Sequence, residues 1–216
     1  MGRRREHDEI TAEALLDAAE RTIAADGVDA LSLRVLARDA GTTTRAIYSL
    51  FGSKDGLLGA LGVRAFNLLQ REIEALPATD QPRTDLVEVA LIFRRFALEH
   101  PALYSIAFHR ADSAIWPRFR TAATDALAVL DKRFEPLEGA DLLGGRSIAE
   151  AAMQFALLCE GLAWGYELRG NPAPADAERF WRNAVHALIT GFAAPTPDRP
   201  RRTTRRRRPT AASPDI

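Results

Sequence analysis

The sequence predicts an all-α fold of about nine helices. Apolar residues recur at helical spacing along most of the chain, N-cap residues precede these stretches, and Gly or Pro follows them. Alternating β-branched runs, which are typical of strands, do not occur. We expect an N-terminal three-helix unit with a helix-turn-helix, followed by a C-terminal helical bundle that dimerises.

Start and stop signals divide the N-terminal part into four helices. Glycines follow the first three helices, at Gly27, Gly41 and Gly52, and Gly27 suits the left-handed position after a helix. Hydroxyl side chains suited to N-caps precede the later ones, at Ser32, at Thr42 or Thr43, and at Ser53. The expected helices cover residues 7–25, 33–40, a third stretch ending at Phe51, and 54–75, before a linker over 77–82.

Prolines and glycines separate the helices of the C-terminal part. The expected helices cover residues 84–99, 102–109, 113–134, 148–168 and 176–192. The third of them contains Pro117, which fits only in a first turn or at a kink. A loop is expected over 136–145, and Gly170-Asn-Pro ends the long apolar helix.

Composition excludes several classes of protein. The chain has 216 residues, of which 47% are apolar and 27% charged, enough for a sizeable core. No apolar run is long enough to cross a membrane, and no signal-peptide pattern opens the chain. Cys159 is the only cysteine, which excludes an internal disulfide framework and a cysteine-rich zinc site. A cytoplasmic location is therefore expected.

Charge is unevenly distributed, although 29 Lys plus Arg balance 29 Asp plus Glu. Residues 195–216 contain seven arginines and two aspartates, so this tail carries +5 and residues 1–194 carry −5. The tail has almost no apolar side chains and is predicted to be disordered. Arg3 to Arg5 form a second, smaller basic arm.

Enzyme chemistry has little support in the sequence. Four histidines show no metal-ligand spacing, and there is no glycine-rich phosphate loop. No Ser or Cys nucleophile is paired with a base by any motif. We therefore predict no catalytic residues, no metal and no cofactor.

Residues 31–58 have the layout of a helix-turn-helix: two short helices joined by a glycine turn. Leu36, Ala37 and Ala40 are expected to pack against Ile47, and the small Ala37 permits a close crossing. The second helix begins with Thr42-Thr-Thr-Arg45, which offers three hydroxyls and a guanidinium. Recognition helices read base edges with their N-terminal residues, and helix N-termini bind phosphate.

Residues 10–58 resemble the TetR family of bacterial transcriptional regulators. The resemblance rests on the spacing of Leu31-Ser-Leu-Arg-x-Leu-Ala, Gly41, Ile47-Tyr48-x-x-Phe51 and Ser53-Lys54-x-x-Leu57-Leu58. It implies base-edge contacts by Arg34, Thr44 and Arg45, and phosphate contacts by Thr43, Tyr48 and Lys54. Ser32 then looks like a cap that also donates to a phosphate.

Two positions depart from the family pattern, and several roles have a plainer alternative. Arg45 stands where members often have Gly or Pro, and Leu50 where histidine is frequent, so the bases that are read stay open. Tyr48 could instead be a core aromatic residue, Arg34 a solvated surface charge, and Ser32 only a cap.

The C-terminal part resembles one branch of that family over residues 93–104. The branch is named for a Trp-His-Gly tripeptide, where this chain has Cys159-Glu160-Gly161. The resulting domains are 1–58 for DNA binding, with helix 54–75 as the connection, 59–194 for ligand binding and dimerisation, and the tail 195–216.

An effector pocket is expected between helices of the bundle. Its candidate lining is Tyr104, Phe108, Trp116, Phe119, Phe155, Glu160 and Trp164. For each aromatic residue taken singly, plain core is the favoured alternative. Glu160 needs a partner if it is buried, and the alternative is a surface or arginine-paired carboxylate. Cys159 is interpreted as a buried apolar residue rather than a redox sensor.

A homodimer is expected because one short recognition helix covers only a few base pairs. Helices 148–168 and 176–192 have the apolar surface to pair with their copies, and Gly161, Ala163 and Gly165 permit close approach. The alternative is that these small residues pack only within one subunit.

These observations lead to one functional hypothesis and one alternative. The hypothesis is a cytoplasmic, ligand-responsive repressor that a small molecule releases from a palindromic double-stranded DNA operator. The alternative is a non-specific DNA-binding or packaging protein that uses the arginine tail and has no effector.

Overall fold

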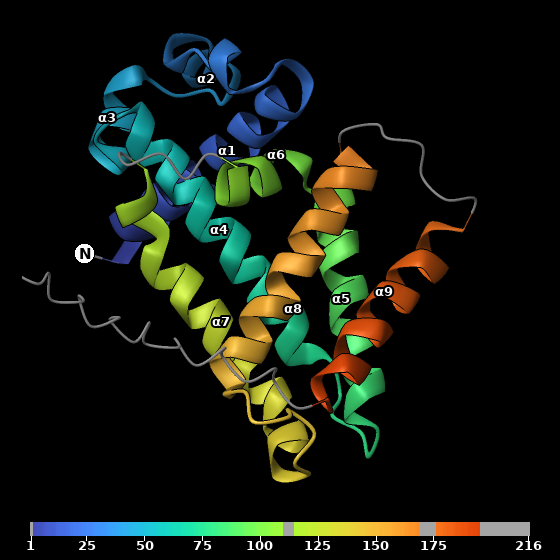
Figure 1. Cartoon of the computed structure of the whole chain (residues 1–216). Coiled ribbons are helices and arrows are strands. Elements are labelled where there is room, and N and C mark those ends of the chain that lie inside the picture. Colours follow the sequence, from blue (N-terminus) through green and yellow to red (C-terminus); the bar gives the residue numbers. More distant parts are fainter. Residues whose placement is uncertain (1, 110–114, 169–175, 195–216) are drawn as a thin grey trace, which may run out of the picture.

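The computed structural model describes residues 2–109, 115–168 and 176–194, and these are helical without a strand (Figure 1). The α-helices of this part of the chain are α1 (Gly2–Asp26), α2 (Leu33–Asp39), α3 (Thr44–Phe51), α4 (Lys54–Ala75), α5 (Pro82–Glu99), α6 (Pro101–Tyr104), α7 (Trp116–Gly139), α8 (Ile148–Leu162) and α9 (Ala177–Phe192). Shorter elements are the 3₁₀ turn η1 (Val28–Ala30) and the π-helical segments η2 (Ser105–His109) and η3 (Ala163–Leu168). The predicted all-α class is confirmed.

Most helix bounds agree with the sequence, and α4 has the predicted range. The prediction that the helix after residue 113 ends at Phe134 is wrong, since α7 continues through Pro136 to Gly139. Leu137 is fully buried, so packing holds the last turn of α7 despite the missing N–H of Pro136. The expected helices 102–109 and 148–168 both end as π-helical segments.

The molecule has two parts joined by α4. Figure 1 shows α2 and α3 at one end, with α1 crossing behind α4 and α4 running on into the C-terminal bundle. There α4 packs along α7, α5 packs against α9, and α8 lies between α7 and α9. Fully buried Trp181, Phe96 and Phe134 belong to the core of the bundle. No helix in the described ranges is long and apolar enough to cross a membrane.

Glycines on α4 allow α7 to approach closely. A Cβ built on Gly59 would lie 2.7 Å from Cβ of Arg118, and one built on Gly62 would lie 2.5 Å from Cδ1 of Phe119. Real Cβ atoms do not approach heavy atoms this closely, so these two positions require the absence of a side chain. The contact fixes α7 against the helix that leaves the DNA-binding unit.

Candidate nucleic-acid interface

The turn between α2 and α3 has the geometry of a helix-turn-helix. Gly41 adopts a φ of 64°, a conformation that side-chain-bearing residues rarely take, and the Thr42 N–H donates to the Ala37 carbonyl at 2.8 Å. On the inner faces Leu36, Ala37 and Ile47 are all buried. The predicted packing of the two short helices is confirmed, and it leaves their outer faces free.

The outer face of α3 presents the predicted contact residues. Thr43 is the N-cap, and its hydroxyl oxygen accepts from the Ala46 N–H at 3.2 Å. Thr44 and Arg45 are exposed. Tyr48 is 55% exposed, so it is not the core aromatic residue of the alternative interpretation.

The start of α2 contributes Ser32 and Arg34, which are both exposed. Ser32 stands at the N-cap position, but among the described atoms its hydroxyl makes no capping hydrogen bond. The prediction that the Ser32 side chain caps α2 is therefore wrong. Its hydroxyl is not used for capping.

Lys54 joins the beginning of α4 to the beginning of α2. Its Nζ donates to the Leu31 carbonyl at 2.8 Å, and the side chain is half-buried. An ammonium has three N–H groups, so two remain for another acceptor. Ser53 caps the same helix by accepting from the Gly56 N–H at 3.0 Å.

A cluster of ion pairs connects α1 to α4 and to the α5–α6 corner, and no sequence pattern predicts it. Arg64 on α4 pairs with Glu13, Asp17 and Glu20 of α1. Glu20 also lies 2.8 Å from Nδ1 of His100, at the corner between α5 and α6. The partners are 44 to 80 positions apart in the chain, and no local pattern relates them.

A small apolar cavity lies in the bundle between α4, α5, α7 and α8. Its volume is about 60 Å³, roughly the space of two liquid water molecules. The lining includes two predicted pocket residues, Phe108 and Phe155, together with Phe66, Phe93 and the buried Cys159. Burial raises the pKa of the Cys159 thiol, as expected for an interior apolar residue.

Of the other predicted pocket residues, those whose side chains the structure describes do not line this cavity. Tyr104 and Phe119 are fully buried, and the Tyr104 hydroxyl donates to the Glu160 carbonyl at 2.9 Å. Glu160 is half-buried, and burial raises the pKa of its carboxyl. Trp164 stacks on His109 with ring centroids 3.8 Å apart. The side chain of Trp116, the first residue of α7, lies outside the described part.

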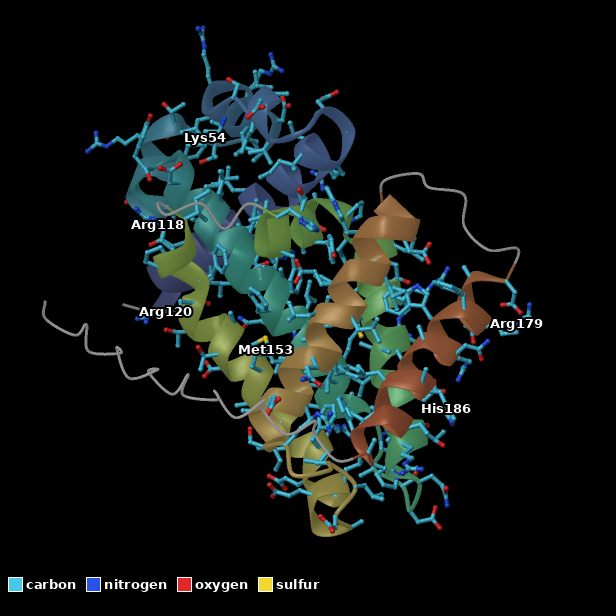
Figure 2. All side chains as sticks on the ribbon, in the orientation of Figure 1. Lys54, Arg118, Arg120, Met153, Arg179 and His186 are labelled. Atoms are coloured by element: carbon cyan, nitrogen blue, oxygen red, sulfur yellow. The ribbon has the colours of Figure 1, made fainter. Side chains whose placement is uncertain are left out.

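An exposed apolar strip runs along α8. Met153 and Leu157 are 45% and 58% exposed, one helical turn apart. A Cβ on Gly161, a further turn along, would meet no described atom within 4 Å. Figure 2 shows Met153 on α8 and His186 on α9, and these two helices contact each other. Across the described ranges, no group of three or more His, Cys, Asp or Glu could hold a metal ion.

Two family models match the chain on either side of the α4–α5 linker. Residues 15–61 match "Bacterial regulatory proteins, tetR family", and residues 86–188 match "Tetracyclin repressor-like, C-terminal domain". The first covers the helix-turn-helix and the start of α4, and the second covers most of the bundle.

Individual relatives are regulators of the same kind. The chain is 27% identical over 111 residues to the HTH-type transcriptional regulator Mb1846 of Mycobacterium bovis, covering 50% of this chain and 47% of the relative. It is 35% identical over 78 residues to the HTH-type nicotine-responsive transcriptional repressor HdnoR of Paenarthrobacter nicotinovorans, covering 36% and 39%. The matched part thus spans half or less of the length of these curated relatives.

A solved structure shares the whole fold. The transcriptional regulator FadR from Bacillus subtilis, solved in complex with stearoyl-CoA, superposes with a TM-score of 0.71 at 15% identity, covering 83% of this chain and 98% of FadR. Together with the two family matches and the exposed face of α3, these likenesses establish the class. The chain belongs to the TetR family of helix-turn-helix transcriptional regulators.

Proposed function

We propose that this protein is a homodimeric repressor that binds a palindromic operator and is released from it by a small apolar molecule. The observation that carries the proposal is the exposed face of α3, where Thr44, Arg45 and Tyr48 project opposite the buried Ile47. A polar, outward-facing short helix held by a buried inner face is what insertion into the major groove requires.

Roles on the DNA follow from the chemistry of each side chain. Base edges are read by Arg34, Thr44 and Arg45. A guanidinium can donate to O6 and N7 of guanine, and a hydroxyl can hydrogen-bond to A·T or to G·C base pairs. Ser32, Thr43, Tyr48 and Lys54 contact phosphates, which set the register of the protein but carry no sequence information. The bond from Lys54 to Leu31 supports this assignment because it holds the ammonium at the end of α4 nearest α2.

In the proposed homodimer, α8 and α9 of one protomer pack against α8 and α9 of its partner. The exposed Met153 and Leu157 on α8 would be covered, and the open space at Gly161 would allow a partner helix to approach. Two recognition helices would then lie about 34 Å apart, one turn of DNA. Met153→Glu with Leu157→Glu should give a monomer in sedimentation equilibrium; a dimer of unchanged affinity would contradict this interface.

The effector is an uncharged, largely apolar molecule that enlarges the cavity. The cavity volume of about 60 Å³ is below that of an ordinary ligand site, so binding must displace a wall residue. Phe108, on the π-helical segment η2, is the aromatic wall residue that is only half-buried, and it is the one that we expect to be displaced. HdnoR is a nicotine-responsive repressor and FadR was solved with stearoyl-CoA, which supports a ligand-responsive role.

Footprinting of the full chain on the DNA upstream of its own gene tests the proposal. A discrete protected site should appear, and Arg45→Ala with Tyr48→Ala should abolish it. Arg38→Ala is the matched control, because Arg38 is exposed but already paired with Asp39 at 3.0 Å. Uniform weak protection, unchanged in the double variant, would instead favour non-specific DNA binding through the arginine tail.

A further inference from the structure

We propose that Arg118, in the first turn of α7, is an additional phosphate contact supplied by the C-terminal domain. The inference rests on the proposed DNA binding and adds to it a contact outside the helix-turn-helix. It also places one DNA-binding residue on the same helix that lines the effector cavity.

The glycines of α4 direct this side chain toward the DNA-binding unit. Cβ and Cδ of Arg118 lie 2.7 and 2.8 Å from a Cβ built on Gly59, so the side chain lies flat along α4. Its Nη1 lies 3.4 Å from a Cβ built on Gly56, the third residue of that helix. The same built atom lies 1.7 Å from the Phe51 carbonyl oxygen, where α3 ends. The guanidinium therefore sits at the α3–α4 corner beside Gly56. Gly56 itself is two residues along the chain from Lys54.

The charge of Arg118 is uncompensated. The residue is exposed, and within the described ranges its guanidinium makes no ion pair and no hydrogen bond. Five other arginines of the C-terminal domain are bound to carboxylates or carbonyls, namely Arg94, Arg95, Arg133, Arg146 and Arg182. Arg71 and Arg120 are exposed and, within the described ranges, make no ion pair, but neither has the contact with Gly56 and Gly59 that fixes Arg118. Arg118 is thus positioned by packing alone and keeps its hydrogen-bond donors for an external acceptor.

The DNA-binding unit needs cations from elsewhere. Residues 1–58 contain eight Lys plus Arg and ten Asp plus Glu, a net charge of −2. Phosphate neutralisation supplies much of the affinity of a protein for DNA, and a guanidinium matches phosphate in geometry as well as charge. A cation fixed beside Gly56 at the α3–α4 corner would add a positive charge to this unit, within the first turn of the helix that begins with Lys54.

This placement would couple the effector cavity directly to the DNA. Ala123, Ala126 and Leu130 of α7 line the cavity that Phe108 and Phe155 also border. A ligand that shifts α7 would withdraw Arg118 from its phosphate. The ligand and the DNA would then weaken each other's binding reciprocally.

Arg120 provides a matched control. It is exposed, carries the same charge, and lies two residues further along α7, about 200° around the helix from Arg118. Figure 2 shows Arg118 near the α3–α4 corner and Arg120 further from it. Loss of Arg120 removes the same net charge without removing the proposed contact.

The test measures the affinity of the full-length wild type and of Arg118→Gln, Arg118→Lys and Arg120→Gln for the footprinted duplex, between about 50 and 200 mM salt. One phosphate per protomer predicts that Arg118→Gln reduces the slope of log K against log salt by about 1.8 per dimer. The dissociation constant of the dimer should rise about tenfold at the lowest salt, which corresponds to about 1.4 kcal/mol for the two contacts together. Arg118→Lys should keep most of the slope, and Arg120→Gln should match the wild type.

Three outcomes would separate the possible failures. A wild-type slope in Arg118→Gln overturns the contact while leaving the proposed function intact. Equal losses in Arg118→Lys and Arg118→Gln, with an unchanged slope, would mean that the residue acts only by packing on Gly59, and this also overturns it. Absence of a footprint with the wild-type chain would instead contradict the proposed function itself.

Discussion

The ring of Phe119 on α7 fills the space beside Gly62 on α4 that a side chain would otherwise occupy. Cδ1 and Cγ of the ring lie 2.5 and 2.8 Å from the Cβ that Gly62 lacks, and Phe119 is fully buried. The ring also stacks on Phe66, with centroids 5.9 Å apart, and Phe66 borders the cavity. The contact therefore joins the cavity wall to the helix that leads to the DNA-binding unit.

Gly62→Ala should lower the free energy of unfolding by about 1 kcal/mol. Overpacking typically costs about 1–3 kcal/mol, and the better helix propensity of alanine returns about 1 kcal/mol of this. Chemical denaturation measures the change. Gly139→Ala, where a Cβ meets no described atom within 4 Å, is the control and should not destabilise.

Rescue identifies Phe119 as the cause of that loss. Phe119→Leu added to Gly62→Ala should give a coupling energy of at least about 0.5 kcal/mol in a double-mutant cycle, as contacting residues do. Additive effects of the two substitutions would contradict the close approach of α4 and α7.

Arg94→Met should lower the free energy of unfolding by about 3 kcal/mol, because it leaves a buried carboxylate without its partner. Arg94 Nε lies 2.7 Å from Glu167 Oε1, and the Glu167 side chain is only 8% exposed. Glu167→Leu added to Arg94→Met should recover much of the loss. Arg182→Met removes a more exposed pair with Glu88 and should cost less than about 1 kcal/mol; equal losses at the two sites would contradict the account.

His109 should make the protein less stable in acid. Burial lowers the pKa of His109 from its ordinary value of 6.5, and its Nε2 is buried without a described hydrogen-bond partner. Because the unfolded chain then binds the proton more readily, stability is full above pH 6.5 and falls as the pH drops through that value toward the folded pKa. The free energies of unfolding of the wild type and of His109→Phe should differ by a constant amount above this range. Below it, the wild type should lose stability with falling pH more steeply than His109→Phe. Parallel pH profiles would exclude the effect.

A chain ending at residue 194 should bind DNA with a weaker salt dependence but the same sequence preference. The removed segment carries seven arginines, and each phosphate contact that is lost reduces the slope by about 0.9. Measurements on matched and scrambled duplexes separate the two quantities. An altered footprint would mean that the tail reads bases rather than phosphates.

Local signals account for the parts of the fold that the sequence predicts well. Ser53 and the glycine before it mark the start of α4, and the hydrophobic spacing carries the helix to Ala75. Gly41 and Thr43 likewise define the turn and the cap of the recognition helix because both act on their own neighbours. Pro136 shows the limit, since burial of Leu137 overrides a local helix-breaking signal.

Contacts between distant residues explain what the sequence does not show. Gly56, Gly59 and Gly62 share one face of α4 and indicate a close helix crossing, but not that Arg118 and Phe119 fill it. Aromatic content predicted a ligand pocket, yet Tyr104 and Phe119 pack as solid core and Phe108 and Phe155 border the cavity. Which aromatic residues leave space depends on the packing of four helices together.

Selection of binding sites from a randomised duplex pool tests whether the protein binds DNA sequence-specifically as a two-fold dimer. We predict enrichment of palindromes whose half-sites are centred about 10 base pairs, or a multiple of that, apart. The variant combining Arg45→Ala and Tyr48→Ala should enrich nothing. No enrichment by the wild type, or the same enrichment by the double variant, would contradict it.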